Sequence, residues 1–318
     1  MKDDVARWYA RRTWADPPWE VDELVGAKGP RTVSVVLPAL DEEATVGAVV
    51  AAVAPLRGTL VDELVVVDSG STDATAAVAA AAGARVVSRE EALPGIDVVA
   101  GKGEVLWRAL AATTGDLVVY LDADLVDLGD DGVRFVTALL GPLLTADGVE
   151  LVKGFYHRPL RLPGPGGPEV DAVAAGGGRV TELVARPVLG ALRPALAGVV
   201  QPLGGEYAAT RALLESLPFA AGYGVEIGLL LDTERTRGLD ALAQVDLGVR
   251  KHRHRSLRAL GVSAAEVLDA ALRRCAPDPD GPREGVLTQF VPGRGGWVAE
   301  EHTVAVFDRP PMRELRRR

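Results

Sequence analysis

An apolar run at residues 117–121 leads directly into the tripeptide Asp-Ala-Asp at 122–124, and this junction constrains the fold more than any other feature. The run has the length and composition of a buried β-strand, and the Gly-Asp pair before it marks a turn. It is the fourth apolar run in a series in which each run alternates with a helical pattern. Such alternation indicates an α/β protein with a doubly wound, mostly parallel sheet.

The strands of this series are expected at residues 33–37, 64–67, 85–87 and 117–121. Right-handed crossovers bring the carboxyl ends of all four strands to one edge of the sheet, where ligands bind in open α/β folds. Two carboxylates one residue apart at that edge suit a hard divalent cation such as Mg2+ or Mn2+. A cation of that kind suits a diphosphate, so the junction predicts both a cofactor and a substrate class.

The remaining elements suggest one continuous fold with two functional halves. A Gly- and Pro-rich stretch at 161–178 is expected to be a mobile loop, and a further strand is expected at 149–153. The predicted units are a nucleotide-sugar-binding half at 1–125, an acceptor-binding half at 126–275, and an extension with a basic tail at 276–318. Helices are expected at 41–53, 74–82, 104–112, 133–144, 179–192, 225–237 and 263–274.

Composition narrows the class of protein. The chain has 318 residues, of which 48% are hydrophobic and 25% charged, as in an ordinary soluble globular protein. A net charge of −9 argues against nucleic acid as the main partner. The single cysteine, Cys275, excludes an internal disulfide and a cysteine-based zinc site. Residues 1–20 do not resemble a signal peptide, and no run approaches the roughly 20 apolar residues that span a bilayer, so we expect a cytoplasmic protein.

Three more loops are expected beside the acidic tripeptide. In residues 37–42, backbone groups could read a nucleobase and Glu42 a ribose, although a strand terminator and an acidic helix start explain the same residues. In residues 68–73, Asp68 and Ser69 stand at a strand end that could bind a nucleoside, while the rest fits helix N-capping. Lys102, between two glycines before a helix, could approach a phosphate, although the spacing is not that of a P-loop.

Taken together, the motifs at 35–43, 67–73 and 122–124 resemble those of GT-A nucleotide-sugar glycosyltransferases. A more specific set resembles the actinobacterial glucosyl-3-phosphoglycerate synthases, and the likeness runs from about Trp19 to Arg313. This second set consists of residues 86–90, 101–104, 176–183, 205–207 and 222–228.

The resemblance implies a GT-A fold and a metal-dependent hexosyltransferase that needs Mg2+ or Mn2+. It implies transfer of glucose from a nucleotide diphosphate, usually UDP-glucose, to the 2-hydroxyl of 3-phosphoglycerate with retention of anomeric configuration. It also implies a homodimer. A related alternative is a mannosyl-3-phosphoglycerate synthase that uses GDP-mannose.

The resemblance further implies roles for individual residues. Catalytic roles would belong to Glu226, Lys102 and Asp124. The metal would be ligated by Asp124 and His252. The acceptor would be bound by Gly178, Arg179, Thr181 and His254, where relatives are expected to carry asparagine in place of His254. The nucleotide sugar would be bound by Pro38, Ala39, Leu40, Glu42, Ser69, Lys102, Asp122, Ala123, Tyr223, Arg250 and Arg255.

The chemistry of the residues agrees with these roles. A small trianionic acceptor needs a local basic site on an acidic protein, and the run at 250–255 carries four cations and two histidines. The metal and Lys102 would offset charge on the departing diphosphate. We favour front-face attack, with Glu226 orienting the acceptor or sugar hydroxyls, over double displacement.

Three other functions remain to be weighed against this one. A sugar-1-phosphate nucleotidyltransferase would have a Gly-rich, basic loop after the first strand, where this chain has residues 38–43. A silent nucleotide-sugar-binding protein is disfavoured by the intact acidic tripeptide and the basic run. A polyprenyl-phosphate glycosyltransferase is disfavoured by the absence of an apolar membrane segment from the sequence.

Overall fold

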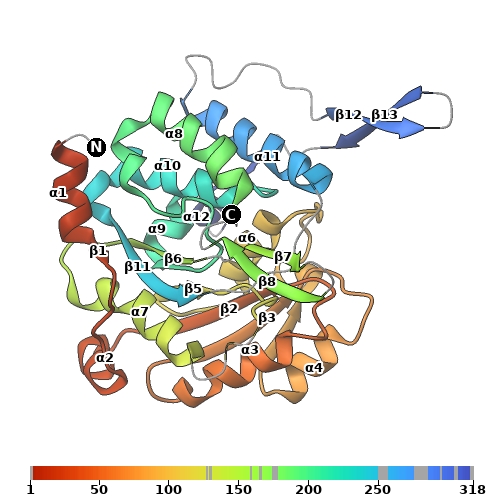
Figure 1. Ribbon diagram of the computed structural model, residues 1–318. Helices are drawn as coiled ribbons and strands as arrows, with labels where there is room; N and C mark the ends of the chain where they lie inside the picture. Colours follow the sequence, from red (N-terminus) through yellow and green to blue (C-terminus); the bar gives the residue numbers. More distant parts are fainter. Residues whose placement is uncertain are drawn as a thin grey trace.

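The computed structural model describes residues 3–126, 128, 131–157, 160–164, 167–173, 178–249, 257–275, 286–293, 296–303 and 307–315. A mixed sheet of eight strands runs through the centre of this part of the chain, and helices cover both faces (Figure 1). This architecture confirms the expected α/β class.

The strands of the central sheet are parallel to their neighbours except for β9, which runs antiparallel to both β5 and β6. The first four strands predicted from the sequence are adjacent, in the order β5-β2-β3-β4. In sheet order the strands are β1 (Thr13–Trp14), β11 (Leu242–Val249), β6 (Leu151–His157), β9 (Tyr207–Thr210), β5 (Leu117–Tyr120), β2 (Val33–Ala39), β3 (Glu63–Asp68) and β4 (Arg85–Ser88).

Two apolar clusters hold the helices on the two faces, because alternate strand residues point to opposite sides. Val35 of β2 belongs to one cluster and Val36 to the other. The first cluster receives α2 (Val21–Lys28), α3 (Val46–Val53), α4 (Thr75–Ala81) and α7 (Asp131–Thr145). The second receives α1 (Asp3–Arg12), α6 (Lys102–Ala112), α8 (Arg186–Leu192), α9 (Arg211–Ser216), α10 (Val225–Arg237), α11 (Leu257–Cys275) and α12 (Met312–Leu315).

Shorter elements complete the described chain, and none of its helices is long and apolar enough to cross a membrane. A turn of π-helix at Thr181–Ala185 precedes α8. The others are α5 (Arg89–Ala92), the 3-10 turns at Ala54–Leu56, Pro194–Gly198 and Leu239–Ala241, and the strands β7 (Leu160–Gly164), β8 (Gly167–Val173), β10 (Phe219–Ala220), β12 (Val286–Gly293), β13 (Gly296–Thr303) and β14 (Asp308–Arg309).

Two expectations about local structure are wrong. The helix expected from residue 41 begins at Val46, because Asp41 adopts a left-handed backbone with φ of 54° and uses its carboxylate to bind the backbone of Thr72. The stretch expected to be a mobile loop, 161–178, contains most of an antiparallel hairpin, β7–β8. Gly164 of β7 pairs with Gly167 of β8, and Pro163 and Pro168 are their neighbours in the strands, so residues typical of loops stand within a hairpin here.

The segment at 307–315, here called the closing segment, packs back onto the second face of the sheet. Its strand β14 pairs antiparallel with β10, just before α10. Arg309 forms two hydrogen bonds with Glu104 in the first turn of α6, at 2.7 and 3.0 Å. Trp107 of the same helix donates a hydrogen bond to the carbonyl of Pro310 at 3.0 Å. The closing segment therefore joins the starts of α6 and α10.

Candidate active site

The loops that follow β2, β3 and β5 and the start of α6 meet at the carboxyl edge of the sheet, as the sequence predicts. Pro38 and Ala39 end β2, Ser69 follows β3, and Asp122 follows β5. The backbone amide of Ser69 donates to the carbonyl of Ala39 at 2.8 Å, which ties the first two loops together. Leu40 is exposed beside them.

A three-residue ionic cluster lies at this edge. The ammonium of Lys102 lies 2.7 Å from Asp122 Oδ1 and 2.9 Å from Glu226 Oε1. Burial alone would lower the pKa of Lys102, but the two adjacent carboxylates raise it well above its ordinary value, so this lysine stays charged. Removing one member of such a cluster leaves an uncompensated charge, at a cost of about 3–5 kcal/mol for fully buried pairs. The sequence predicted all three residues as site residues, and the structure brings them together.

Close backbone packing puts Lys102 in place. The amide of Glu104 donates to the carbonyl of Ala221 at 2.9 Å, so the start of α6 lies against the segment before α10. A Cβ at Gly103 would come 1.8 Å from the carbonyl oxygen of Ala220, which a side chain there would displace. Gly101 has a φ of 132°, which favours glycine. The glycines on each side of Lys102 are therefore needed for this packing.

Hydrogen bonds from polar side chains join the loop that follows β2 to the loop that follows β3. Asp41 accepts a hydrogen bond from the Thr72 amide at 2.7 Å, and the Glu42 amide donates to Thr75 Oγ1 at 2.7 Å. Asp68, which the sequence left open as a nucleoside ligand, accepts hydrogen bonds from its own loop, including the Ser71 amide at 3.2 Å. These contacts fix the loop shapes before any ligand arrives.

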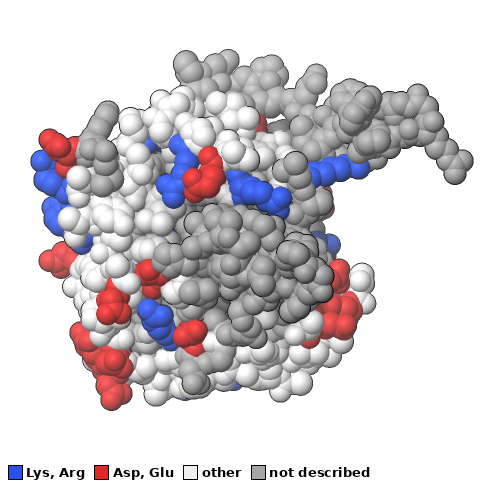
Figure 2. All heavy atoms as spheres, in the orientation of Figure 1, with Lys and Arg blue, Asp and Glu red and all other residues white. Residues whose placement is uncertain are grey.

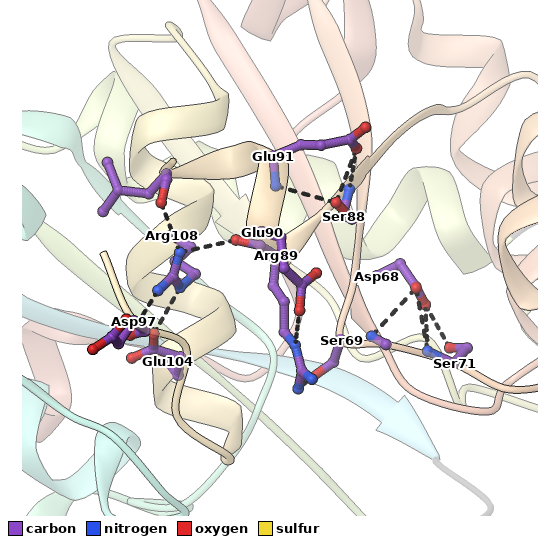
Figure 3. A network of polar contacts seen from close by, with 12 residues as sticks. Asp68, Ser69, Ser71, Ser88, Arg89, Glu90, Glu91, Asp97, Glu104 and Arg108 are labelled. Atoms are coloured by element: carbon purple, nitrogen blue, oxygen red, sulfur yellow. Dashed lines mark hydrogen bonds and ion pairs between the residues drawn. The ribbon is translucent and has the colours of Figure 1, made fainter. Parts of the chain in front are cut away.

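A buried arginine shapes the segment that leads to Lys102 (Figure 3). Arg108 of α6 is fully buried, pairs with Glu104 at 2.6 Å and donates to four backbone carbonyls within residues 89–97. Arg89, the first residue of that segment, donates a hydrogen bond to the hydroxyl of Ser69 at 3.4 Å. The burial of Arg108 could not be predicted from the sequence, because its partners are mostly backbone carbonyls.

The acceptor-side residues predicted from the sequence lie on the other half of the fold. Arg179 is exposed and opens the helical stretch that continues through α8, while Thr181 is buried. Gly178 has a φ of 82°, and its carbonyl accepts the first hydrogen bond of that stretch from the amide of Glu182 at 2.9 Å. Tyr223 lies just before α10, and its amide donates to Glu266 Oε2 at 2.7 Å.

One residue that sequence reasoning missed is buried under the site. Lys153 of β6 is 3% exposed, donates a hydrogen bond to the carbonyl of Gly204 and lies with its ammonium 4.7 Å from the ring centre of Tyr207. Lys153 is the last residue of the strand expected at 149–153. Its burial could have been suspected only because that strand would be covered on both faces of the sheet.

A divalent cation fits this edge through Asp124, whose half-buried carboxylate is the hard oxygen ligand that Mg2+ and Mn2+ prefer. Within the described residues no three His, Cys, Asp or Glu side chains gather closely enough to hold a metal. Further ligands would therefore come from a diphosphate or from the basic run. The predicted residues Arg250, His252, His254 and Arg255 lie outside the described residues.

Comparisons with family models, with curated proteins and with solved structures agree with one another. Residues 34–140 match the model of the family described as Glycosyl transferase family 2. The chain is 58% identical over 315 residues to the glucosyl-3-phosphoglycerate synthase of Mycolicibacterium paratuberculosis (strain ATCC BAA-968 / K-10), with 98% of this chain and 93% of that relative covered.

Solved structures of the glucosyl-3-phosphoglycerate synthase of Mycobacterium tuberculosis also match. Its complex with Mn2+, UDP-glucose and phosphoglyceric acid has a TM-score of 0.84 and 54% identity, covering 95% of this chain and 98% of that one. Its complex with Mg2+ and UDP has the same TM-score and identity, with coverages of 96% and 99%.

Proposed function

Because this chain belongs to the glucosyl-3-phosphoglycerate synthase family, we propose that it transfers glucose from UDP-glucose to the 2-hydroxyl of 3-phosphoglycerate. The chain is a metal-dependent glycosyltransferase with the GT-A fold. The observation that carries the proposal is the cluster of Lys102, Asp122 and Glu226 at the end of β5, which presents a cation among carboxylates where a nucleotide diphosphate would lie.

We propose that the donor lies across the ends of β2, β3 and β5. The hydrogen-bonded loops that follow β2 and β3 would hold uridine through Pro38, Ala39, Leu40, Glu42 and Ser69. Asp122 and Ala123 would border the diphosphate. Arg89, which reaches Ser69, would stabilise the uridine loop. In this arrangement Lys102 binds the diphosphate, for which its high pKa and its place at the start of α6 suit it.

The acceptor would lie beside the donor, against the second half of the fold. Arg179 can hold a carboxylate or phosphate with two hydrogen bonds, and the helical stretch that begins there favours an anion at its start. Figure 2 shows basic side chains near α8 and α11, with acidic side chains beside one of them, and acidic side chains over α2. On a protein with net charge −9, such basic side chains would attract a trianion.

In the transfer step, charge develops on the departing diphosphate. The bound divalent cation, held through Asp124, supplies Lewis-acid stabilisation of that charge. Lys102 adds a second positive charge from the protein itself. Glu226, 4% exposed and paired with Lys102, would orient the acceptor hydroxyl and the sugar. We propose retention of configuration by front-face attack, and a glucosyl adduct trapped on Glu226 would contradict that route.

The decisive experiment is an activity matrix. UDP-glucose, GDP-glucose, UDP-mannose and GDP-mannose are each combined with 3-phosphoglycerate, glycerate or no acceptor, with and without EDTA. Release of UDP that needs UDP-glucose, 3-phosphoglycerate and the metal, with an α-anomeric product by NMR, is the expected result. Preferred turnover of GDP-mannose would identify a mannosyl transferase, and pyrophosphate release from a nucleoside triphosphate would identify a nucleotidyltransferase.

We also propose a homodimer in the cytoplasm, where the sugar nucleotide and the phosphoglycerate are made. The β12–β13 hairpin supports the dimer: its strands pair with each other, and it extends away from the sheet in Figure 1. The outer edges of such a hairpin can pair with another chain. Light scattering should give twice the monomer mass, and a variant lacking residues 286–303 should give a smaller mass if the hairpin joins the copies.

A further inference from the structure

Lys153 lies beneath the proposed donor site but is not among the residues expected to bind a substrate. Its side chain rises from the middle of the sheet, where β6 pairs with β9 and Lys153 is opposite Tyr207. Burying an ammonium group is costly unless it is paired and hydrogen-bonded, and buried groups with perturbed pKa values cluster at functional sites. The position of Lys153 therefore calls for an explanation beyond packing.

A short chain of contacts connects Lys153 to the ionic cluster. Its ammonium donates to the carbonyl of Gly204. The next residue, Gly205, lies so close to the cluster that a Cβ on it would come 2.4 Å from Asp122 Oδ2 and 2.5 Å from Lys102 Nζ. The hydrogen bond from Lys153 thus holds the backbone that packs directly against the Lys102–Asp122 pair.

The side chain of Lys153 lies among the charged groups of the cluster. Glu226, the fully buried Glu206 and Asp122 are carboxylates whose charges act on it, and Lys102 is a cation that also acts on it. Burial lowers the pKa of Lys153 to about 8, with Glu226, Glu206 and Asp122 opposing the effect, so Lys153 is mostly protonated at pH 7. Its positive charge opposes the negative charges of the carboxylates that Lys102 also faces.

We propose that Lys153 is a positioning residue for donor binding, which holds the Gly204–Gly205 backbone against Lys102 and offsets the surrounding carboxylates so that Lys102 can engage the diphosphate. This inference rests on the proposed function. It assigns Lys153 no contact with substrate. In its absence Lys102 would be held more firmly by carboxylates and would be less available to an incoming anion.

The chain offers a matched control in a second buried lysine. Lys28 is 6% exposed, donates to the carbonyl of Thr59 at 3.0 Å and pairs with Asp62 at 2.6 Å. Asp62 directly precedes β3, so this pair lies where the strands begin and not where they end. Lys28→Met and Lys153→Met therefore each remove a buried ammonium group. The first group lies near the amino ends of the strands, and the second lies near the proposed donor site at their carboxyl ends.

The test measures binding of UDP with Mn2+ by isothermal titration calorimetry, the unfolding temperature, and kcat and KM for both substrates. Lys153→Met should weaken UDP binding about tenfold or more and raise the KM for UDP-glucose, because a charge is lost from a buried cluster. The KM for 3-phosphoglycerate should change much less. Lys28→Met should lower the unfolding temperature and leave UDP affinity within about twofold of wild type.

The proposal is overturned if Lys153→Met only lowers the unfolding temperature, as Lys28→Met does, and binds UDP normally. If Lys153→Met does not fold, Lys153→Gln replaces it, since the amide keeps a donor for Gly204 but carries no charge. Wild-type affinity in Lys153→Gln would also refute the role of the charge. A wild-type protein that binds no UDP would instead contradict the proposed function itself.

Discussion

The two edges of the central sheet use charged side chains in opposite ways. At the amino edge, two carboxylates bind the backbone where β2 begins: Asp62 accepts from the Val33 amide at 2.7 Å, and Asp116 accepts from the amide of the preceding residue, Thr32, at 2.8 Å. At the carboxyl edge, the carboxylates that follow β5 and open α10 face one lysine of α6 and each other. At the amino edge, nearby hydrogen-bond donors satisfy the carboxylates one by one. At the carboxyl edge, several charged groups lie together in one cluster.

This difference separates structural from functional polar groups in one sheet. The amino-edge acids take up hydrogen-bond donors that the strand ends would otherwise leave unpaired, so they secure the register. The carboxyl-edge cluster includes charges that repel one another and are partly buried, which costs stability. We propose that a ligand offsets this cost, and the amino edge supplies control variants for the tests that remove a charge from the carboxyl edge.

The strongest test compares the two ends of β5. Asp124→Ala should lower metal-dependent turnover by about a thousandfold, because a proposed metal ligand is lost. Asp116→Ala, at the amino end of the same strand, should retain nearly full turnover. The measurement is UDP release across a Mn2+ series together with direct Mn2+ binding. Equal losses in the two variants would contradict the distinction between the edges.

The next largest effect is expected at Lys102. Lys102→Met should lower kcat for glucose transfer by about 100- to 1000-fold, as does loss of a group that stabilises developing negative charge. Lys28→Met is again the matched control, and its kcat should stay within a few-fold of wild type. A kcat for Lys102→Met close to that of the control would mean that the diphosphate is stabilised by other groups.

A smaller effect should follow from adding one methyl group at the cluster. Gly205→Ala puts a Cβ within 2.6 Å of Asp122 and Lys102, so the pair must shift, and the KM for UDP-glucose should rise about tenfold. Gly190→Ala in α8 meets no atom within 4 Å and should leave the KM unchanged. Similar steady-state kinetics for the two variants would show that the cluster tolerates displacement.

The pH dependence of donor affinity sharpens the comparison further. Lys153 is surrounded by Glu226 from α10, Lys102 from α6, and Glu206 and Asp122 from loops, and its pKa is lowered to about 8. UDP affinity, measured by calorimetry with Mg2+, should therefore fall severalfold as the pH rises through 8, since the charged form is the one that positions Lys102.

Stability should respond to the same group in the opposite direction. Between pH 8 and 10.5 the unfolded chain keeps a proton on this lysine that the folded protein has lost, so the contribution of this group to stability rises with pH. Loss of affinity above pH 8 without loss of folding would support this account. A Lys153→Met variant that keeps the same decline in affinity would contradict it.

The smallest effect is expected at the amino edge itself. Hydrogen bonds from the backbone and hydroxyl of Thr32 lower the pKa of Asp116 below its ordinary value. The contribution of Asp116 to the free energy of unfolding is therefore present at neutral pH and is lost as the pH falls below about 4. Asp116→Ala should cost less than about 1 kcal/mol at pH 7, because the group is exposed, and nothing at pH 2. Urea unfolding of the wild type and of Asp116→Ala at pH 7 and at pH 2 measures the difference in the free energy of unfolding.

The sequence was most informative where a few adjacent residues determine the structure. The strand series and the loops after it follow from local patterns, so the carboxyl edge and its residues Lys102 and Asp122 could be predicted. The burial of Lys153 could not, because it depends on β9, a short strand that follows Gly204 and Gly205 and was not expected. The roles proposed from resemblance for the acceptor residues remain predictions, since contacts between distant segments decide them.

The closing segment is synthesised long after α6, whose first turn it contacts. Arg309 binds Glu104, which lies 205 positions earlier in the chain and two residues from Lys102. The first four strands of the sheet can pair before residues 307–315 are made, whereas the contacts of α6 with Arg309 and Pro310 form only once β14 is present. A nascent chain that stops before Asp308 would thus hold the start of α6 less firmly beside Lys102, and its affinity for the donor should be lower than that of a chain that includes β14.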